Sequence, residues 1–419
     1  MSDEKPLIST LANIAENEPQ NLQAYADKVV HLEFFGDDSS HHKLFKDLRF
    51  SNLETLWLDA SDHNDDASLD PYLQSKLKRF IFYGGSISDV FLDKLQASCP
   101  LLEELLIDNP RDLISPEGFL RFLDGAKALK RVSVMYGMSR AITDSVVVAL
   151  ATKPGLEILE FQELITEDLA SRIVAEQRSR HGADKKLFPE LRELTCVAES
   201  GGLASLLPFL FKLVRLEANA AYNSVPSTPI QDSIIHNIGS HCIGLQTLKL
   251  EYRPIEGQHI HIAPEDLVRL AQHLHKLEEL SVSGGQIEAP MFRDSHFASI
   301  MEALQHLKVL HLKFACCLTE FALEEASKHC GARLAELELD GTYNLSNLAG
   351  SDVSFPQLSS LELGQLASRS VADDAIATEA TDIARLLKNM APKLEYFDVM
   401  SGNILSDMIL DELDEIDEI

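Results

Sequence analysis

One short apolar pattern recurs along the whole 419-residue chain and restricts its fold more than any other feature. Three apolar residues follow the spacing apolar-x-x-apolar-x-apolar, as in Leu102, Leu105 and Ile107. A fixed period of about 20 to 50 residues indicates a repeat protein rather than a set of separate compact domains. Fourteen such frames begin at Val29, Leu53, Leu77, Leu102, Leu129, Leu156, Leu191, Leu213, Leu245, Leu277, Leu307, Leu334, Leu358 and Leu394, with spacings of 22 to 36 residues.

Each frame predicts a strand that is followed by a helix. The last two apolar residues of a frame are two apart, which is the period of a strand. After the frame at Leu77 the period changes, because Leu92, Leu95 and Cys99 are spaced by three and four residues as one helix face requires. Pairs of a hydroxyl residue and an acid, such as Ser88-Asp89 and Thr143-Asp144, begin several expected helices. The hydroxyl can cap free N–H groups there, and the acid favours the positive end of the helix dipole.

Stacking of the repeats is expected because no single repeat can bury its own apolar face. The repeat period is typical of leucine-rich repeats. We therefore predict an α/β leucine-rich-repeat solenoid of about fourteen repeats, with a curved parallel sheet on the concave side and helices on the convex side. Residues 29–400 form the solenoid, 1–28 form an N-terminal helical cap, and 401–419 form either an acidic C-terminal cap or an acidic docking tail. No internal domain boundary is expected.

Cysteines at the ends of expected helices indicate a subfamily. Cys99, Cys242 and Cys330 each stand just before the next strand. This placement resembles the cysteine-containing, RNI-like repeats of F-box/LRR proteins, and the segment Leu7–Leu32 is similar to the junction that follows the F-box in fungal members. No F-box signature stands in the 28 residues before the first expected strand. The resemblance therefore concerns the substrate-reading repeats rather than the adaptor contact.

The resemblance implies a non-catalytic protein-recognition module, similar to the substrate-reading subunit of an F-box/LRR ubiquitin-ligase receptor and monomeric by itself. A free-standing scaffold or inhibitor is the alternative among binding proteins. From a different class, Ran GTPase-activating proteins are also acidic leucine-rich-repeat solenoids. Their repeats carry an asparagine three residues after the last apolar strand position, where this chain has residues such as Ser61, Gly85 and Pro110.

Charge and hydropathy narrow the partners and the compartment. The chain has 66 acidic and 37 basic side chains, a formal charge of −29, which disfavours nucleic acid and anionic membranes as partners. No stretch approaches the roughly 20 apolar residues of a membrane span, and the N-terminus lacks the basic and apolar regions of a signal peptide. We expect a protein of the cytoplasm, the nucleus or both.

No constellation for catalysis, metal or cofactor binding is expected. The six cysteines form no CxxC pair and are interpreted as reduced packing residues. His259 and His261 alternate on an extended segment, but no acid or thiol stands at ligand spacing nearby. Glycine pairs such as Gly84-Gly85 lack a phosphate-binding pattern. We predict no enzyme activity, no metal and no cofactor.

The concave face of the first five repeats is the predicted partner-binding surface. Residues that flank the last two apolar positions of a frame point away from the core. Clustered apolar residues on such a face cost solubility unless they are used, and Trp, Tyr and Arg dominate binding hot spots. The alternative is that the N-terminal segment or a loop covers this patch. The predicted binding residues are Phe35, Trp57, Arg79, Ile81, Tyr83, Leu106, Arg131 and Met135.

The concave face of the last repeats carries an acidic ladder. Like charges on adjacent parallel strands lie close together and repel. Either solvent screens this ladder or a basic partner binds it. Its members are Glu336, Glu338, Asp340, Glu362 and Asp398, and the earlier repeats nine and eleven contribute Lys249, His311 and Lys313.

Overall fold

The computed structural model describes residues 7–35, 39–59, 66–111, 114–181, 187–221, 230–231, 234–254, 258–370 and 372–417. Its contacts divide the chain into two compact units. The first unit comprises Met1–Leu164 and Asp168–Cys196, and the second comprises Ile165–Glu167 and Val197–Ile419. The predicted division into cap, solenoid and tail follows other boundaries and stays a prediction.

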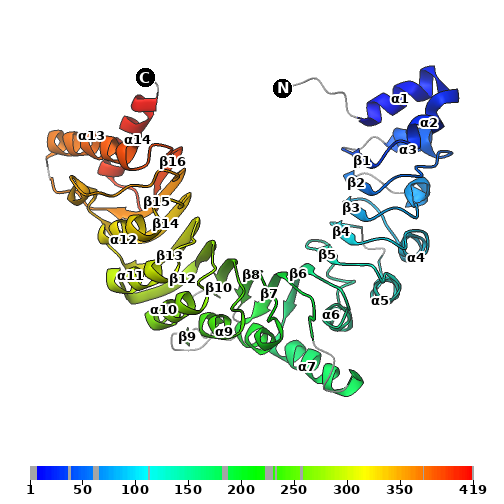
Figure 1. Cartoon of the computed structure of the whole chain (residues 1–419), viewed down its shortest axis with the longest axis horizontal. Helices are drawn as coiled ribbons and strands as arrows, with labels where there is room; N and C mark the ends of the chain where they lie inside the picture. Colours follow the sequence, from blue (N-terminus) through cyan, green and yellow to red (C-terminus); the bar gives the residue numbers. More distant parts are fainter. Residues whose placement is uncertain are drawn as a thin grey trace. The chain divides into compact units, whose positions relative to one another are not determined.

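The first unit is a parallel sheet whose helices lie on one face (Figure 1). Its strands follow one another in chain order. They are β1 (His31–Phe34), β2 (Thr55–Asp59), β3 (Arg79–Tyr83), β4 (Glu104–Asp108), β5 (Arg131–Val134), β6 (Ile158–Ile165) and the beginning of β7 (Glu193–Glu199). The helices are α1 (Leu7–Asn17), α2 (Leu22–Ala26), α3 (Ser39–Phe45), α4 (Asp89–Ser98), α5 (Pro116–Gly125), α6 (Asp144–Ala151) and α7 (Glu167–His181), with 3-10 helices at Pro19–Asn21 and Asp66–Tyr72.

The second unit repeats this construction (Figure 1). Its main parallel strands are β8 (Arg215–Ala221), β10 (Thr247–Arg253), β12 (Glu279–Arg293), β13 (Val309–Cys317), β14 (Glu336–Tyr343), β15 (Ser360–Leu366) and β16 (Tyr396–Val399). The helices are α8 (Ser200–Leu206), α9 (Ile234–His241), α10 (Pro264–His273), α11 (Asp294–Ala303), α12 (Phe321–Cys330), α13 (Asp373–Met390) and α14 (Ile404–Asp417), with 3-10 helices at Leu207–Phe209 and Leu345–Leu348.

All fourteen apolar frames lie at strands of this structure, and the predicted leucine-rich-repeat fold is confirmed. The register follows the frames: Leu56 of β2 pairs with Phe80 of β3, which pairs with Leu105 of β4 and then Val132 of β5. All four side chains are fully buried. Equivalent frame positions therefore stack into one continuous apolar row between the strands and the helices.

Two short strands in the second unit were not predicted. β9 (Ile230–Gln231) and β11 (Ile260–His261) pair with each other, and β11 also pairs with Ile287 and Glu288 of β12. They belong to the two repeats with 32-residue spacing, between the frames at Leu213, Leu245 and Leu277. A two-residue strand has no periodicity that the sequence could reveal.

The predicted helix start Ser88-Asp89 caps its own helix and also links two neighbouring repeats. Ser88 accepts a hydrogen bond from the Phe91 N–H, as expected of an N-cap. Asp89, the first residue of α4, accepts hydrogen bonds from the N–H and the hydroxyl of Ser115, which caps the next helix α5 (2.8 and 2.5 Å). The acid thus stabilises two helix starts in adjacent repeats. The prediction fails at Thr143, which makes no side-chain cap.

The same link recurs between α11 and α12 in the second unit. Asp294 accepts hydrogen bonds from the N–H and the hydroxyl of Thr319 (2.9 and 2.8 Å). The segments predicted as caps form helices: α1 packs on α2, α3 and β1, and α14 packs on α13 and β16. Their capping role, and the alternative of an acidic docking tail, stay open predictions.

Candidate partner-binding surfaces

Three aromatic rings lie side by side on the strand face that the helices do not cover. Phe35 follows β1, Trp57 lies in β2 and Tyr83 ends β3. The ring centroids of Phe35 and Trp57 are 6.0 Å apart, and those of Trp57 and Tyr83 are 5.9 Å apart. Phe35 is 67% exposed, while Trp57 and Tyr83 are partly buried. We call these three residues the aromatic row.

Ile81 lies beside the aromatic row but is buried. It was expected to face solvent, yet its exposed fraction is only 8%. In the register of the sheet, Ile81 stands between Trp57 of β2 and Leu106 of β4 on the same face. These larger or equal side chains cover it laterally, so the expectation of an exposed isoleucine was wrong. Leu106 and Met135 are partly buried on this face.

Both arginines predicted to contact a partner already hold an acid of this chain. Arg79 Nε lies 3.0 Å from Glu104 Oε2. The Arg131 guanidinium donates to both carboxylate oxygens of Glu160 at 3.2 Å. These ion pairs use donors that a partner would otherwise bind, so the two arginines are weaker binding candidates than the rings.

Asp108 is a polar group of this face that the sequence argument did not single out. It stands next to Tyr83 in the register of β3 and β4. Burial raises the pKa of Asp108, an effect that the nearby backbone N–H groups of Tyr136 and Asn109 oppose. Its buried Oδ1 atom has no hydrogen-bond partner among the described residues. Burial, with the charge of Asp108, also raises the pKa of Tyr83.

Part of the acidic ladder of the second unit is compensated by a lysine of the same chain. Lys313 Nζ lies 3.0 Å from Glu338 and 2.7 Å from Glu362. The imidazole of His311 lies 3.4 Å from Glu336 and 3.5 Å from Glu338. The sequence suggested either solvent screening or a basic partner for these carboxylates. The structure shows a third arrangement, in which Lys313 of the same chain binds Glu338 and Glu362.

The remaining two carboxylates of the ladder bond locally. Asp340 accepts a hydrogen bond from the Gly341 N–H at 2.7 Å, and burial raises its pKa. Asp398 accepts from the Tyr396 hydroxyl at 3.0 Å and from the Val399 N–H at 2.8 Å. The ladder is thus a structured network rather than a free anionic surface, and its role in binding stays a prediction.

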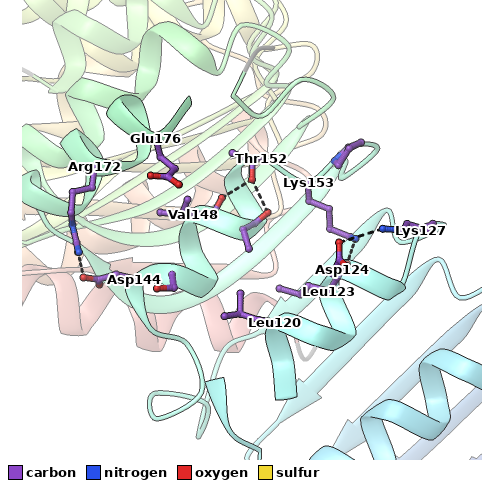
Figure 2. Close-up of a pocket in the computed structure, with 13 residues that line it drawn as sticks. Leu120, Leu123, Asp124, Lys127, Asp144, Val148, Thr152, Lys153, Arg172 and Glu176 are labelled. Carbon is purple, nitrogen blue, oxygen red and sulfur yellow. Dashed lines mark hydrogen bonds and ion pairs between the residues drawn. The ribbon is translucent and has the colours of Figure 1, made fainter. Parts of the chain in front are cut away.

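A cavity of about 670 Å³ opens between α5, α6 and α7 on the helical side of the first unit (Figure 2). Its apolar lining comes from residues such as Leu120 and Val148. Lys153 is only 7% exposed, and its ammonium group donates to the backbone carbonyls of Leu123 and Ala126 at 2.6 and 2.9 Å. Burial lowers the pKa of Lys153. This lysine closes the C-terminal end of α5, which is a structural role.

Other charged groups at this cavity are also paired within the chain. Figure 2 shows Arg172 bound to Asp144, and Lys127 lies 3.4 Å from Asp124. The cavity was not predicted from the sequence. The 35-residue spacing between the frames at Leu156 and Leu191 was its one available signal, because this long repeat holds the 15-residue helix α7.

The histidine pair meets an acid from a distant part of the sequence. Glu288 of β12 lies between the two imidazoles, 2.8 Å from His259 Nδ1 and 3.4 Å from His261 Nε2. The pairing of β11 with β12 brings together residues that are about 30 positions apart in the chain. Among the described residues, no three His, Cys, Asp or Glu side chains gather around a point that could hold a metal ion.

The cysteines lie largely in the core. Cys99, Cys196, Cys242 and Cys330 are buried free thiols, whereas Cys316 is partly buried and Cys317 is exposed. Burial raises the pKa of Cys99 and Cys242 to about 12. Such thiols act as small apolar packing groups, as the sequence argument predicted for the helix ends. Within the described part of the chain, no helix has the length and apolar character needed to cross a membrane.

The stacked strand–helix units define a leucine-rich-repeat protein. No family model and no curated protein matches the sequence. A chain of the crystal structure of the Rad7 and Elc1 complex from yeast is similar over 94% of this chain and 87% of its own length, with 15% identity and a TM-score of 0.48. The leucine-rich-repeat protein LegL7 of Legionella pneumophila aligns over 92% of this chain and 97% of its own, with 8% identity and a TM-score of 0.27.

Proposed function

We propose that this protein is a non-catalytic recognition module that binds a protein partner on the open strand face of its first unit. The observation that carries the proposal is the aromatic row, in which the 67% exposed ring of Phe35 continues into the partly buried rings of Trp57 and Tyr83. Aromatic anchors in the centre of a patch supply most of the binding energy of protein interfaces. The helices cannot use this face for packing, since they cover the opposite one.

The more specific proposal is a substrate-reading subunit of a ubiquitin ligase in the cytoplasm or nucleus. It is supported by the resemblance of the repeats to F-box/LRR proteins, including the buried cysteines that end α4 and α12. A scaffold or inhibitor without a ligase connection would use the same face. The two are separated by testing whether a partner that binds this face becomes ubiquitinated in a manner that depends on this chain.

The test is a pair of alanine variants with a matched control. A partner is captured by cross-linking and purified, and its affinity for the protein is measured by calorimetry. Trp57→Ala should weaken binding roughly thirtyfold, since truncation of a central aromatic anchor costs ~2 kcal/mol or more, and Tyr83→Ala should act in the same direction. Phe321→Ala removes a 57% exposed ring on α12 and should leave affinity unchanged.

Thermal unfolding of each variant separates binding from folding. Trp57 points away from the apolar row between strands and helices, so its loss should change the melting temperature little. A large loss of thermal stability in Trp57→Ala with unchanged affinity would show that the ring is part of the packed core. The proposed binding face would then be wrong.

A further inference from the structure

The open face of the first unit has an apolar strip with an acidic border. Trp57, Ile81 and Leu106 stand in register on three adjacent strands, which are spaced by ~4.8 Å. Tyr83 lies beside this strip and continues the aromatic row. An apolar side chain of a partner could therefore be covered on several sides within a short distance.

The charged groups around the strip leave a net negative charge. The Arg79–Glu104 and Arg131–Glu160 pairs neutralise themselves. Asp108 forms no ion pair with a basic side chain among the described residues, and the groups acting on its carboxylate are the backbone N–H groups of Tyr136 and Asn109. Asp108 as a whole is only partly buried, so its carboxylate can still accept a hydrogen bond from a partner. Glu33, exposed and in register with Trp57, adds a second negative group at the opposite end of the strip.

Aromatic faces next to carboxylates favour a cation. A guanidinium or ammonium group over a Trp or Tyr ring is attracted by the ring electrons, and a neighbouring carboxylate strengthens the contact by accepting its hydrogen bonds. Trp57 and Tyr83 supply the rings, and Asp108 supplies the carboxylate in register with Tyr83. The formal charge of −29 on the chain attracts a basic partner at long range.

We infer that the partner of this face is a basic, apolar peptide segment, in which an arginine or lysine binds at Trp57, Tyr83 and Asp108 while a neighbouring apolar side chain packs on Ile81 and Leu106. This inference rests on the proposed protein-recognition function and adds the chemical class of the partner. The adjacent ion pairs of Arg79 and Arg131 keep the two acids Glu104 and Glu160 from competing for the incoming cation.

The experiment uses the full chain and its own fluorescence, because Trp57 is the only tryptophan. Three eight-residue peptides are titrated at about 150 mM salt, where long-range attraction is largely screened: alternating Leu and Arg, alternating Leu and Glu, and alternating Ser and Arg. The Leu/Arg peptide should change the Trp57 emission and bind at least tenfold more tightly than either of the others.

Two variants with the same change of charge locate the cation. Asp108→Asn should weaken the Leu/Arg peptide roughly tenfold, as expected for loss of a hydrogen bond to a charged group. Asp124→Asn on α5 removes one negative charge from a 91% exposed position on the helical side and should leave the affinity within about twofold of the wild type. Trp57→Ala, measured by calorimetry, should weaken the Leu/Arg and the Ser/Arg peptides alike, because the ring contacts the arginine that both peptides carry.

Several outcomes overturn the inference. Equal weakening by Asp108→Asn and Asp124→Asn would show only general attraction between a basic peptide and an acidic protein. No Leu/Arg binding, or Leu/Glu binding as tight as Leu/Arg, would show that the partner class is wrong. In these cases the protein-recognition proposal still stands if Trp57→Ala weakens the captured protein partner, and it fails separately if that affinity is unchanged.

Discussion

Replacing Asp89 by alanine should lower the free energy of unfolding of the first unit by about 2 to 3 kcal/mol. Asp89 is half-buried and accepts two hydrogen bonds from Ser115, each worth about 1 kcal/mol net for a partly exposed charged acceptor. Its place in the first turn of α4 adds roughly 0.5 kcal/mol through the helix dipole. Asp93, on the same helix, makes only an exposed ion pair with Arg121, so Asp93→Ala should change stability by less than about 0.5 kcal/mol.

A substitution at Gly118 gives a second test of the contact between Asp89 and Ser115. A Cβ atom at Gly118 would lie 2.1 to 2.6 Å from the carboxyl group of Asp89, so Gly118→Ala forces that carboxylate away from Ser115. In the wild-type background Gly118→Ala should therefore be destabilising. In the Asp89→Ala background the clash is gone, and alanine should stabilise α5 by about 0.5 to 1 kcal/mol over glycine. The effect of one substitution thus changes sign with the other.

Urea unfolding followed by Trp57 fluorescence measures these changes within the first unit, and far-UV circular dichroism checks that the folded variants keep their helices. The four proteins of the cycle and Asp93→Ala are compared by midpoint at constant slope. Equal losses for Asp89→Ala and Asp93→Ala would refute the link between repeats. So would a Gly118→Ala effect of the same sign and size in both backgrounds.

Two further predictions concern thiols and carboxylates. Cys317 should react rapidly with a thiol reagent in the native protein, whereas the buried Cys99, with its pKa raised to about 12, should react only on unfolding, as mass spectrometry of the labelled peptides can show. Burial acts to raise the pKa of Glu320, but hydrogen bonds from Asn347 and the Asn344 N–H outweigh it and lower the pKa below 4.5. A carboxylate whose pKa is lower in the folded than in the unfolded state stabilises the protein above the unfolded pKa, and this stabilisation is lost as the pH falls through the folded pKa. The urea midpoints of wild type and Glu320→Gln should therefore differ at pH 7 and converge below pH about 4.5. A difference between the midpoints that is independent of pH would contradict this.

The fold could be predicted because every repeat buries its apolar frame residues against the same positions of the neighbouring repeats. Leu56, Phe80 and Leu105 must occupy one row for the stack to close, and the sequence repeats them at nearly constant intervals. The short strands β9 and β11 could not be predicted, because they form only where two long repeats lie side by side. The contact between Glu288 and the histidine pair depends on that same pairing.

The burial and the ion pairs of individual side chains on the open face were harder to predict from the sequence. Ile81 has the frame position of an exposed residue, and only its neighbours in the flanking strands bury it. The pairing of Arg79 with Glu104 could have been predicted from the sequence, because the two residues hold the same frame position in adjacent repeats. The bridge from Lys313 to Glu362 was not, since it skips a strand and depends on the length and direction of the lysine side chain.

The contrast between the two units supports the proposal that a partner binds the first one. In the second unit the row His311, Glu338 and Glu362 is held by contacts within the chain, since Lys313 bridges the two carboxylates. The equivalent row in the first unit carries Trp57 and Ile81 instead. These two side chains pack against each other, and they offer no polar group that is bound within the chain. A partner that binds the row of the second unit meets carboxylates that already hold Lys313, whereas one that binds the row of the first unit removes apolar surface from water. We therefore expect a partner to gain more free energy per contact on this row of the first unit.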